Sequence, residues 1–309
     1  MKKNPLTILL YHGVTNKDQK GIVNFSGKHI NIKIFDNHMK FIKNNCNILS
    51  MNEVVEIYNN DKEWPENAVA VTFDDGFQNN YLYAADILDS YKVPATFYIC
   101  AGMVNTNRMF WVDIIEDCIN RTRNSNLDIN LNKQMHFNLN NDKNKIDTIN
   151  EIKKYCKSMD SKKKNNIINE LIKNTNVSPS VESSPDYKIM TWNELNELKN
   201  NSLFTIGGHT LNHEIMSAQN IEKMKMDVKA TLSLINYNLN QKTVHFSYPE
   251  GQIHHYNDTV ISSLIDCGII CSPSAIDGIN FGEDLFNLKR IMPNFMGREF
   301  PFKNYKLKN

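Results

Sequence analysis

The fold is decided by the stretch Val69-Ala70-Val71-Thr72-Phe73-Asp74-Asp75-Gly76, an apolar run rich in β-branched residues that ends in two carboxylates and a glycine. Such a run predicts a strand buried on both faces, as in a parallel sheet. Parallel α/β folds present ligand-binding groups at the carboxyl ends of their strands, where Asp74 and Asp75 would lie. Adjacent carboxylates in a dry site repel each other, so a positive group is expected nearby. Asp-Asp-Gly also suits a plain turn, and this motif alone leaves that alternative equally open.

Strand-like runs of the same kind alternate with helical stretches along the chain. The predicted strands are 7–10, 68–73, 95–100, 203–206 and 244–248. The predicted helices are 35–43, 51–58, 81–91 and 191–200. The last helix opens with a capping-box pattern at Thr191 and Glu194. This alternation favours an α/β fold with a parallel sheet or barrel.

Asparagine and lysine dominate the segment 105–187, which interrupts the alternation. Within it, residues 127–139 alternate around Asn132-Lys133 as a hairpin does, and 146–172 have helical spacing. We therefore expect a single domain, residues 1–309, with an inserted hairpin-plus-helices subdomain at about 105–187.

The composition is that of an ordinary globular protein, with 309 residues, 41% hydrophobic and 22% charged. The chain has 35 basic and 34 acidic residues, so its formal charge is +1. This provides no excess of positive charge for binding nucleic acid or an anionic membrane. The apolar run 6–10 is shorter than the core of a signal peptide, and no stretch is long enough to span a bilayer. We predict a cytoplasmic protein without an integral membrane segment; the oligomeric state is left open.

A candidate metal site comes from His209 and His213, which lie four residues apart just after another apolar run. If the segment turns helically, both rings can meet one ion. One carboxylate added to two imidazoles makes a three-ligand site with open positions for water. Such a site suits a divalent metal, with zinc as the first choice and cobalt, nickel or manganese as alternatives. The ion would also supply the positive charge that the aspartate pair requires.

A third segment, His245-Phe246-Ser247-Tyr248-Pro249-Glu250-Gly251, also closes a β-like run. Its proline and last glycine shape a tight loop whose backbone N–H groups could point inward, as a tetrahedral oxyanion requires. A plain strand-exit turn is the alternative interpretation of this segment.

These motifs follow one another in a distinctive order: TFDDG at 72–76, HTxxH at 209–213 and FSYPxG at 246–251. Together they resemble the polysaccharide deacetylase family, also called the NodB-homology or carbohydrate esterase family 4 group. Tyr11-His12-Gly13-Val14 is similar to the branch whose first strand carries Tyr-His-x-Val. The resemblance covers nearly the whole chain except the asparagine-rich segment, and it implies a distorted (β/α)7 barrel of the NodB-like kind.

The resemblance also implies residue roles. Asp74 would be the general base, and Asp75, His209 and His213 would hold the metal. The backbone N–H of Glu250 would help to bind the oxyanion. The metal would polarise the acyl carbonyl, Asp74 would deprotonate a water molecule, and a proton donor would be needed for the leaving amine.

The chain departs from the family pattern near the base and at the acid. Many members carry arginine in the place of Ser247 and tyrosine in the place of Glu250. The last family motif supplies a histidine as general acid, where this chain offers Arg290, which can orient or stabilise charge but does not readily donate a proton. His12, at the end of the first strand, is then the preferred substitute acid. Trp111 and Tyr248 are further expected to contact the substrate, Trp111 by stacking on a sugar face.

The resulting hypothesis is removal of an N-acyl group, N-acetyl in the first place, from an amino sugar, nucleotide-sugar or glycan precursor. The reaction would belong to surface-polysaccharide or lipopolysaccharide assembly. Within the enzyme class, the alternative is a deformylase or an amidase acting on another small amide. From a different class, the alternative is a catalytically silent sugar-binding protein, motivated by the missing arginine and terminal histidine.

Overall fold

The structure is a computed structural model that describes residues 4–17, 21–159 and 161–301. The chain divides into two compact units. The first unit comprises Met1–Asn16, Ser26–Thr106 and Ile189–Asn309, and the second comprises Lys17–Phe25 and Asn107–Lys188. Because each unit gathers its own core, each is described by itself.

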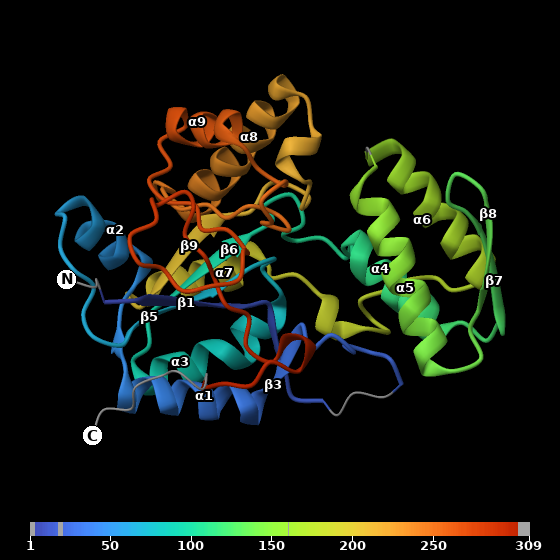
Figure 1. The fold of residues 1–309 in the computed structure, drawn as a ribbon, viewed down its shortest axis with the longest axis horizontal. Helices are drawn as coiled ribbons and strands as arrows, with labels where there is room; N and C mark the ends of the chain where they lie inside the picture. The colour runs from blue at the N-terminus through green and yellow to red at the C-terminus, as the bar shows by residue number, and fades with distance from the viewer. Residues whose placement is uncertain (1–3, 18–20, 160, 302–309) are drawn as a thin grey trace. The chain divides into compact units, whose positions relative to one another are not determined.

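A parallel sheet forms the centre of the first unit (Figure 1). Its strands, in hydrogen-bonded order, are β1 (Leu6–Tyr11), β5 (Ala68–Phe73), β6 (Ala95–Ile99) and β9 (Phe204–Gly208). A short strand, β4 (Asn47–Ile48), pairs with the beginning of β5. Every residue of β1, β5 and β6 is buried, which explains why these strands are continuous apolar runs without polar alternation.

Beyond β9 the sheet continues through single pairings and returns to its first strand. The parallel bridges are Gly208–Phe246, His245–Cys271 and Leu9–Ile291. Between the last two, the backbone N–H of Ser274 donates to the carbonyl of Leu288 at 2.8 Å. The strand predicted at 244–248 therefore exists as isolated bridges, because this part of the barrel is too distorted for a regular ladder.

Helices surround this sheet, and Figure 1 shows α1 and α3 on one side of it and α8 and α9 on the other. The α-helices of this unit are α1 (Ile32–Asn45), α2 (Met51–Asn59), α3 (Ala85–Tyr91), α7 (Trp192–Asn200), α8 (Ile221–Leu239) and α9 (Asp258–Asp266). A π-helical turn, η1 (Asn80–Ala84), precedes α3, and 3-10 turns lie at η3 (Met216–Ala218) and η4 (Phe295–Gly297). The capping box predicted at Thr191 and Glu194 is present at the start of α7. No helix among the described residues is long and apolar enough to cross a membrane.

Two further short strands, β2 (Gly13–Thr15) and β3 (His29–Asn31), pair in parallel next to the end of β1. Gly13 is paired with His29 in this ladder. A Cβ atom on Gly13 would lie 2.0 Å from Nδ1 of His29, so only glycine fits at this position.

The second unit contains the predicted hairpin and helices. Its elements are α4 (Trp111–Arg121), β7 (Asn126–Asn130), β8 (Gln134–Asn138), α5 (Asp142–Lys157), α6 (Ser161–Thr175) and a 3-10 turn, η2 (Pro185–Tyr187). The hairpin turns at Asn132, whose φ of 67° is the left-handed conformation that asparagine tolerates. Alternate residues Leu127 and Ile129 of β7 are buried in a core that α4, α5 and α6 share. The unit also includes the separate segment Lys17–Phe25, which the composition of 105–187 gave no reason to expect.

Candidate active site

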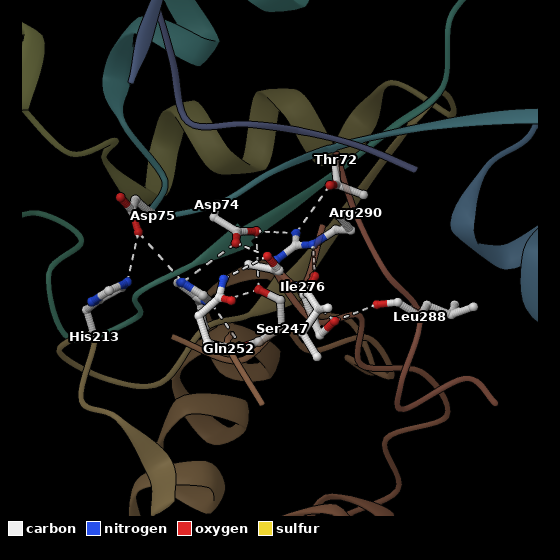
Figure 2. A network of polar contacts seen from close by, with 12 residues as sticks. Thr72, Asp74, Asp75, His213, Ser247, Gln252, Ile276, Leu288 and Arg290 are labelled. Carbon is white, nitrogen blue, oxygen red and sulfur yellow. Dashed lines mark hydrogen bonds and ion pairs between the residues drawn. The ribbon is translucent and has the colours of Figure 1, made fainter. Parts of the chain in front are cut away.

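The two aspartates leave β5 in a turn that separates their side chains. The backbone N–H of Asp74 donates to the carbonyl of Tyr11 at 3.0 Å, so the strand pairing extends as far as Asp74. Asp75 and Gly76 then adopt φ values of 75° and 80°. A left-handed conformation at Asp75 is rare for a residue with a side chain and costs on the order of 1 kcal/mol or more. Its effect is that the two neighbouring carboxylates face different partners (Figure 2).

Asp75 meets the two histidines of the segment that follows β9. Its Oδ1 lies 3.6 Å from Nε2 of His209 and 3.4 Å from Nε2 of His213. Nδ1 of His209 contacts the carbonyl oxygen of Ser247 at 2.9 Å. Because a carbonyl can only accept, that nitrogen carries the proton and Nε2 presents its lone pair toward Asp75.

These three side chains fit a metal ion. One ligand atom from each of Asp75, His209 and His213 lies within 4.8 Å of the others, and all three residues are buried. Oδ1 of Asp75 accepts no hydrogen bond from any residue that the structure describes. A buried carboxylate oxygen without a partner is costly, and a cation shared with two imidazole nitrogens would satisfy it.

Asp74 is bound by an arginine that comes from the far end of the chain. Arg290 donates from Nη1 to Oδ1 of Asp74 at 2.8 Å and from Nη2 to Oδ2 at 2.7 Å (Figure 2). The same guanidinium donates from Nε to the carbonyl of Ser274 at 2.6 Å and from Nη1 to the hydroxyl of Thr72 at 3.2 Å. Only 1% of Arg290 is exposed, so this bidentate contact with Asp74, the Arg290 fork, is fixed inside the barrel.

The partners of Asp74 determine its charge. Burial alone would raise the pKa of Asp74, but the charge of Arg290 and its hydrogen bond to the carboxylate oppose it, and the pKa lies below its ordinary value. The hydroxyl of Ser247 also donates to Oδ1 of Asp74, at 3.2 Å, and lies 2.7 Å from Nδ1 of His209. Asp74 is thus an ionised carboxylate, and its Oδ2 lies 3.9 Å from Nε2 of His209.

A lysine that the sequence did not single out completes the charge balance around Asp75. Nζ of Lys28 lies 3.3 Å from Oδ2 of Asp75 and 4.6 Å from the centre of the Phe77 ring. Burial raises the pKa of Asp75, but Lys28 and the neighbouring histidines reverse this and hold it well below its usual range. No local motif marks Lys28, because it reaches Asp75 only through the pairing of β3 with β2.

His12 lies near both carboxylates, as expected for the first strand end. Burial lowers the pKa of His12 to about 4, while the charges of Asp75 and Asp74 oppose this shift. Its ring is therefore neutral at neutral pH. Nδ1 of His12 is buried and has no hydrogen-bond partner in the described part of the chain.

The other expected site residues have mixed positions. Tyr248 is fully buried; its hydroxyl donates to the carbonyl of Phe286 and its ring stacks on Tyr256 at 4.1 Å. The side chain of Tyr248 therefore packs in the core, and its contact with substrate stays a prediction. Trp111 opens α4 of the second unit, where its ring packs against the core of that unit, and its substrate contact stays a prediction.

Glu250 follows the proline of the third motif with a φ of 61°. Burial lowers the pKa of His213, and the charges of Asp75 and then Glu250 oppose this shift only in part. The oxyanion role of its backbone N–H stays a prediction.

Comparison with known proteins decides the family. Residues 61–271 match the family model described as polysaccharide deacetylase. The chain belongs to the polysaccharide deacetylase family. The matched range includes Asp74, Asp75, His209 and His213, and the family comprises hydrolases that act on carbon–nitrogen bonds. The resemblance found in the sequence is thereby confirmed.

Among curated relatives, YxkH of Bacillus subtilis (strain 168), whose name assigns it to the polysaccharide deacetylases, is 32% identical over 101 residues. This match covers 32% of the chain and 33% of YxkH, so the chain spans about a third of the length of that relative.

Solved structures share the fold over almost the full chain. The deacetylase PplD of Streptococcus pyogenes, solved in complex with acetate, has a TM-score of 0.61 at 18% identity, with 94% of this chain and 93% of PplD covered. A de-N-acetylase from Aggregatibacter actinomycetemcomitans has a TM-score of 0.59 at 17% identity, with 97% of each chain covered. These likenesses confirm the NodB-like α/β fold expected from the sequence.

Proposed function

We propose that this protein is a metal-dependent hydrolase that removes an N-acetyl group from an amino sugar or a glycan precursor. One observation carries the proposal: the buried Oδ1 of Asp75 faces two imidazole nitrogens, while the adjacent Asp74 is kept ionised by Arg290. Such an arrangement supplies an ion site and a base side by side, as hydrolysis of an amide requires.

The donor set of one carboxylate and two imidazoles suits zinc best, and it also accepts cobalt, nickel or manganese. Asp75, His209 and His213 would hold the ion. When bound there, the metal supplies Lewis acidity toward the acyl carbonyl and lowers the pKa of a bound water molecule.

The residues of this chain account for the proton movements. Asp74, ionised and fixed by the Arg290 fork, removes the proton from the attacking water. The departing nitrogen must receive a proton, and His12 is the group proposed to deliver it. The proton that Asp74 takes from the water balances the one that the amine must receive. Because the ring of His12 is neutral, it carries one N–H and one lone pair, so it would accept that proton at one nitrogen as it releases another to the amine. The backbone N–H of Glu250 would stabilise the oxyanion.

The Arg290 fork also bears on the alternative of a silent sugar-binding protein. That alternative rests on the absence of an arginine at Ser247 and of the terminal histidine, and Arg290, which occupies the place of that histidine, supplies a guanidinium to Asp74. A guanidinium on an ionised base has no evident purpose in simple sugar binding, so its presence favours an enzyme. The role in surface-polysaccharide assembly and the cytoplasmic location stay predictions.

The test is release of acetate and formate from a panel of N-acylated amino sugars, nucleotide-sugars and short glycans. The protein is stripped with a chelator and then reloaded with zinc or cobalt, and Asp74→Asn serves as the matched control. We expect acetate release that disappears on stripping, returns with metal and is absent from the control. Metal binding without any release would favour the binding-protein alternative, formate release would favour the deformylase, and absence of metal binding would contradict the proposed site.

A further inference from the structure

We propose that Asn79 and His29 are positioning residues that hold His12 in place relative to Asp74. Neither residue belongs to the metal ligands or to the base. The inference rests on the proposed function, because it assigns the pair to the proton relay of that same site.

The segment that carries His12 is anchored on its N-terminal side by the base itself. His12 stands between the last residue of β1, Tyr11, and the first residue of β2, Gly13. Tyr11 is paired with Phe73, and its carbonyl accepts from the backbone N–H of Asp74 at 3.0 Å. The backbone on this side of His12 is therefore tied directly to Asp74.

On the C-terminal side the anchor is Asn79. The backbone N–H of Val14 donates to Oδ1 of Asn79 at 3.3 Å. Asn79 is only 3% exposed and lies five residues after Asp74, at the N-cap of η1. The segment between β5 and η1 thus contacts the chain on both sides of His12, through the backbone of Asp74 at one end and the side chain of Asn79 at the other.

His29 fixes the orientation of the Asn79 amide. Because Oδ1 of Asn79 already accepts from Val14, its Nδ2 faces Nδ1 of His29, at 2.9 Å. An amide nitrogen can only donate, so Nδ1 of His29 accepts and the ring proton lies on Nε2. His29 is 2% exposed, and its ring packs edge-on against Phe77 at 4.7 Å.

The packing around this pair leaves no room for adjustment. A Cβ atom on Gly13 would lie 2.0 Å from Nδ1 of His29 and 2.8 Å from Oδ1 of Asn79. Both side chains therefore rest directly on the residue that follows His12. Replacing either one opens space beside Gly13 and lets His12 move away from the reacting atoms, and a displacement of about 1 Å can reduce a rate on the order of 100-fold.

The test separates positioning of a proton relay from general support of the fold. We compare hydrolysis of an N-acetyl sugar, whose amine must be protonated to leave, with hydrolysis of 4-nitrophenyl acetate, whose phenolate leaves without a proton. His29→Leu and Asn79→Ala should lower kcat for the N-acetyl sugar on the order of 10- to 100-fold with little change in KM, and should leave the aryl ester reaction nearly unchanged. Zinc binding, measured by titration of the stripped protein, should match the wild type.

Two further variants make the assignment specific. His29→Asn places an acceptor oxygen near the position of Nδ1, so it should recover much of the activity that His29→Leu loses. In the double variant His12→Ala, His29→Leu, the second change should cost nothing more on the N-acetyl sugar, because the residue that it positions is already gone.

Several outcomes would overturn the inference. Equal slowing of both substrates, additive losses in the double variant, or wild-type rates in His29→Leu would each do so. Lack of recovery in His29→Asn when that variant folds as the wild type does, judged by thermal unfolding, would also do so. If the wild type releases no acetate and binds no zinc, the proposed function itself has failed. If the wild type and His12→Ala behave as proposed while His29→Leu and Asn79→Ala do not, only the positioning role has failed.

Discussion

Asp74 and Asp75 are neighbours in the chain, yet they build two different sides of the site. On the Asp75 side, an oxygen faces two histidines that lie close together in sequence. On the Asp74 side, the partners are Ser247 and Arg290, at sequence separations of 173 and 216 residues. The turn at Asp75 makes this division possible, since it directs one carboxylate toward a fixed positive charge and the other toward ligands for an ion. Two carboxylates in contrasting environments can have separate roles in one reaction.

The largest expected effect is on the metal side. His213→Ala removes one of the three proposed ligands, so the protein should lose zinc at concentrations that saturate the wild type and its activity should fall below detection. Zinc content and acetate release are measured on the same sample. His136→Ala, which changes a histidine whose side chain is 66% exposed in the second unit, is the matched control and should behave as the wild type. Retention of zinc by His213→Ala would break the contrast between the two sides.

A smaller but still large effect is expected on the base side. Arg290→Met leaves a buried carboxylate without its counter-charge, and removing one partner of a buried pair costs roughly 3–5 kcal/mol in the free energy of unfolding. We expect kcat to fall on the order of 100-fold while zinc binding persists. Arg290→Lys, which keeps the charge but not the fork, should lie between Arg290→Met and the wild type. Loss of zinc together with activity would show that the two sides are not separable.

Arg290→Met should also change the pH dependence of the activity. The folded-state pKa of Asp74 is below its ordinary value of 3.8, because the charge and the hydrogen bond of Arg290 oppose the effect of burial. The base is therefore ionised, and its contribution to stability is present, above that ordinary value; both are lost as the pH falls through the folded-state pKa. In Arg290→Met burial is less opposed, so the acid limb of kcat/KM should move to higher pH. An unchanged limb would contradict the role of Arg290.

The smallest effect is expected where the two sides touch. Ser247→Ala removes the hydroxyl that lies between Asp74 and His209, a loss of about 1 kcal/mol or roughly fivefold in kcat/KM. Zinc affinity should stay near the wild-type value, because Nδ1 of His209 keeps the carbonyl of Ser247. A tenfold or greater loss of zinc affinity would show that the hydroxyl, not the carbonyl, orients the metal ligand.

The sequence was sufficient for the elements with strong local signals. The run that ends at Phe73 became a strand with the predicted bounds, and the capping pattern at Thr191 began a helix. The spacing of His209 and His213 also identified the candidate metal ligands, because both belong to one short turn.

The remainder depends on contacts between distant segments. The sequence showed only that Arg290 stood where a histidine was expected. Its hydrogen bonds to Asp74 form because the chain next to it, at Ile291, pairs with Leu9 of β1. Lys28 gave no signal, and the burial of Tyr248 was not evident either, because a strand end in a distorted barrel can turn its side chain into the core as readily as toward the substrate.

The central claim is that Asp75 holds a catalytic metal while Asp74 acts as the base. The most direct measurement is zinc binding and acetate release in parallel for Asp74→Asn and Asp75→Asn, two isosteric changes at adjacent positions. We expect Asp74→Asn to bind zinc as the wild type does but to lose at least about 1,000-fold in kcat, whereas Asp75→Asn should lose the metal and, with it, the activity. Near-wild-type acetate release from Asp74→Asn, or undiminished zinc affinity in Asp75→Asn, would contradict the central claim.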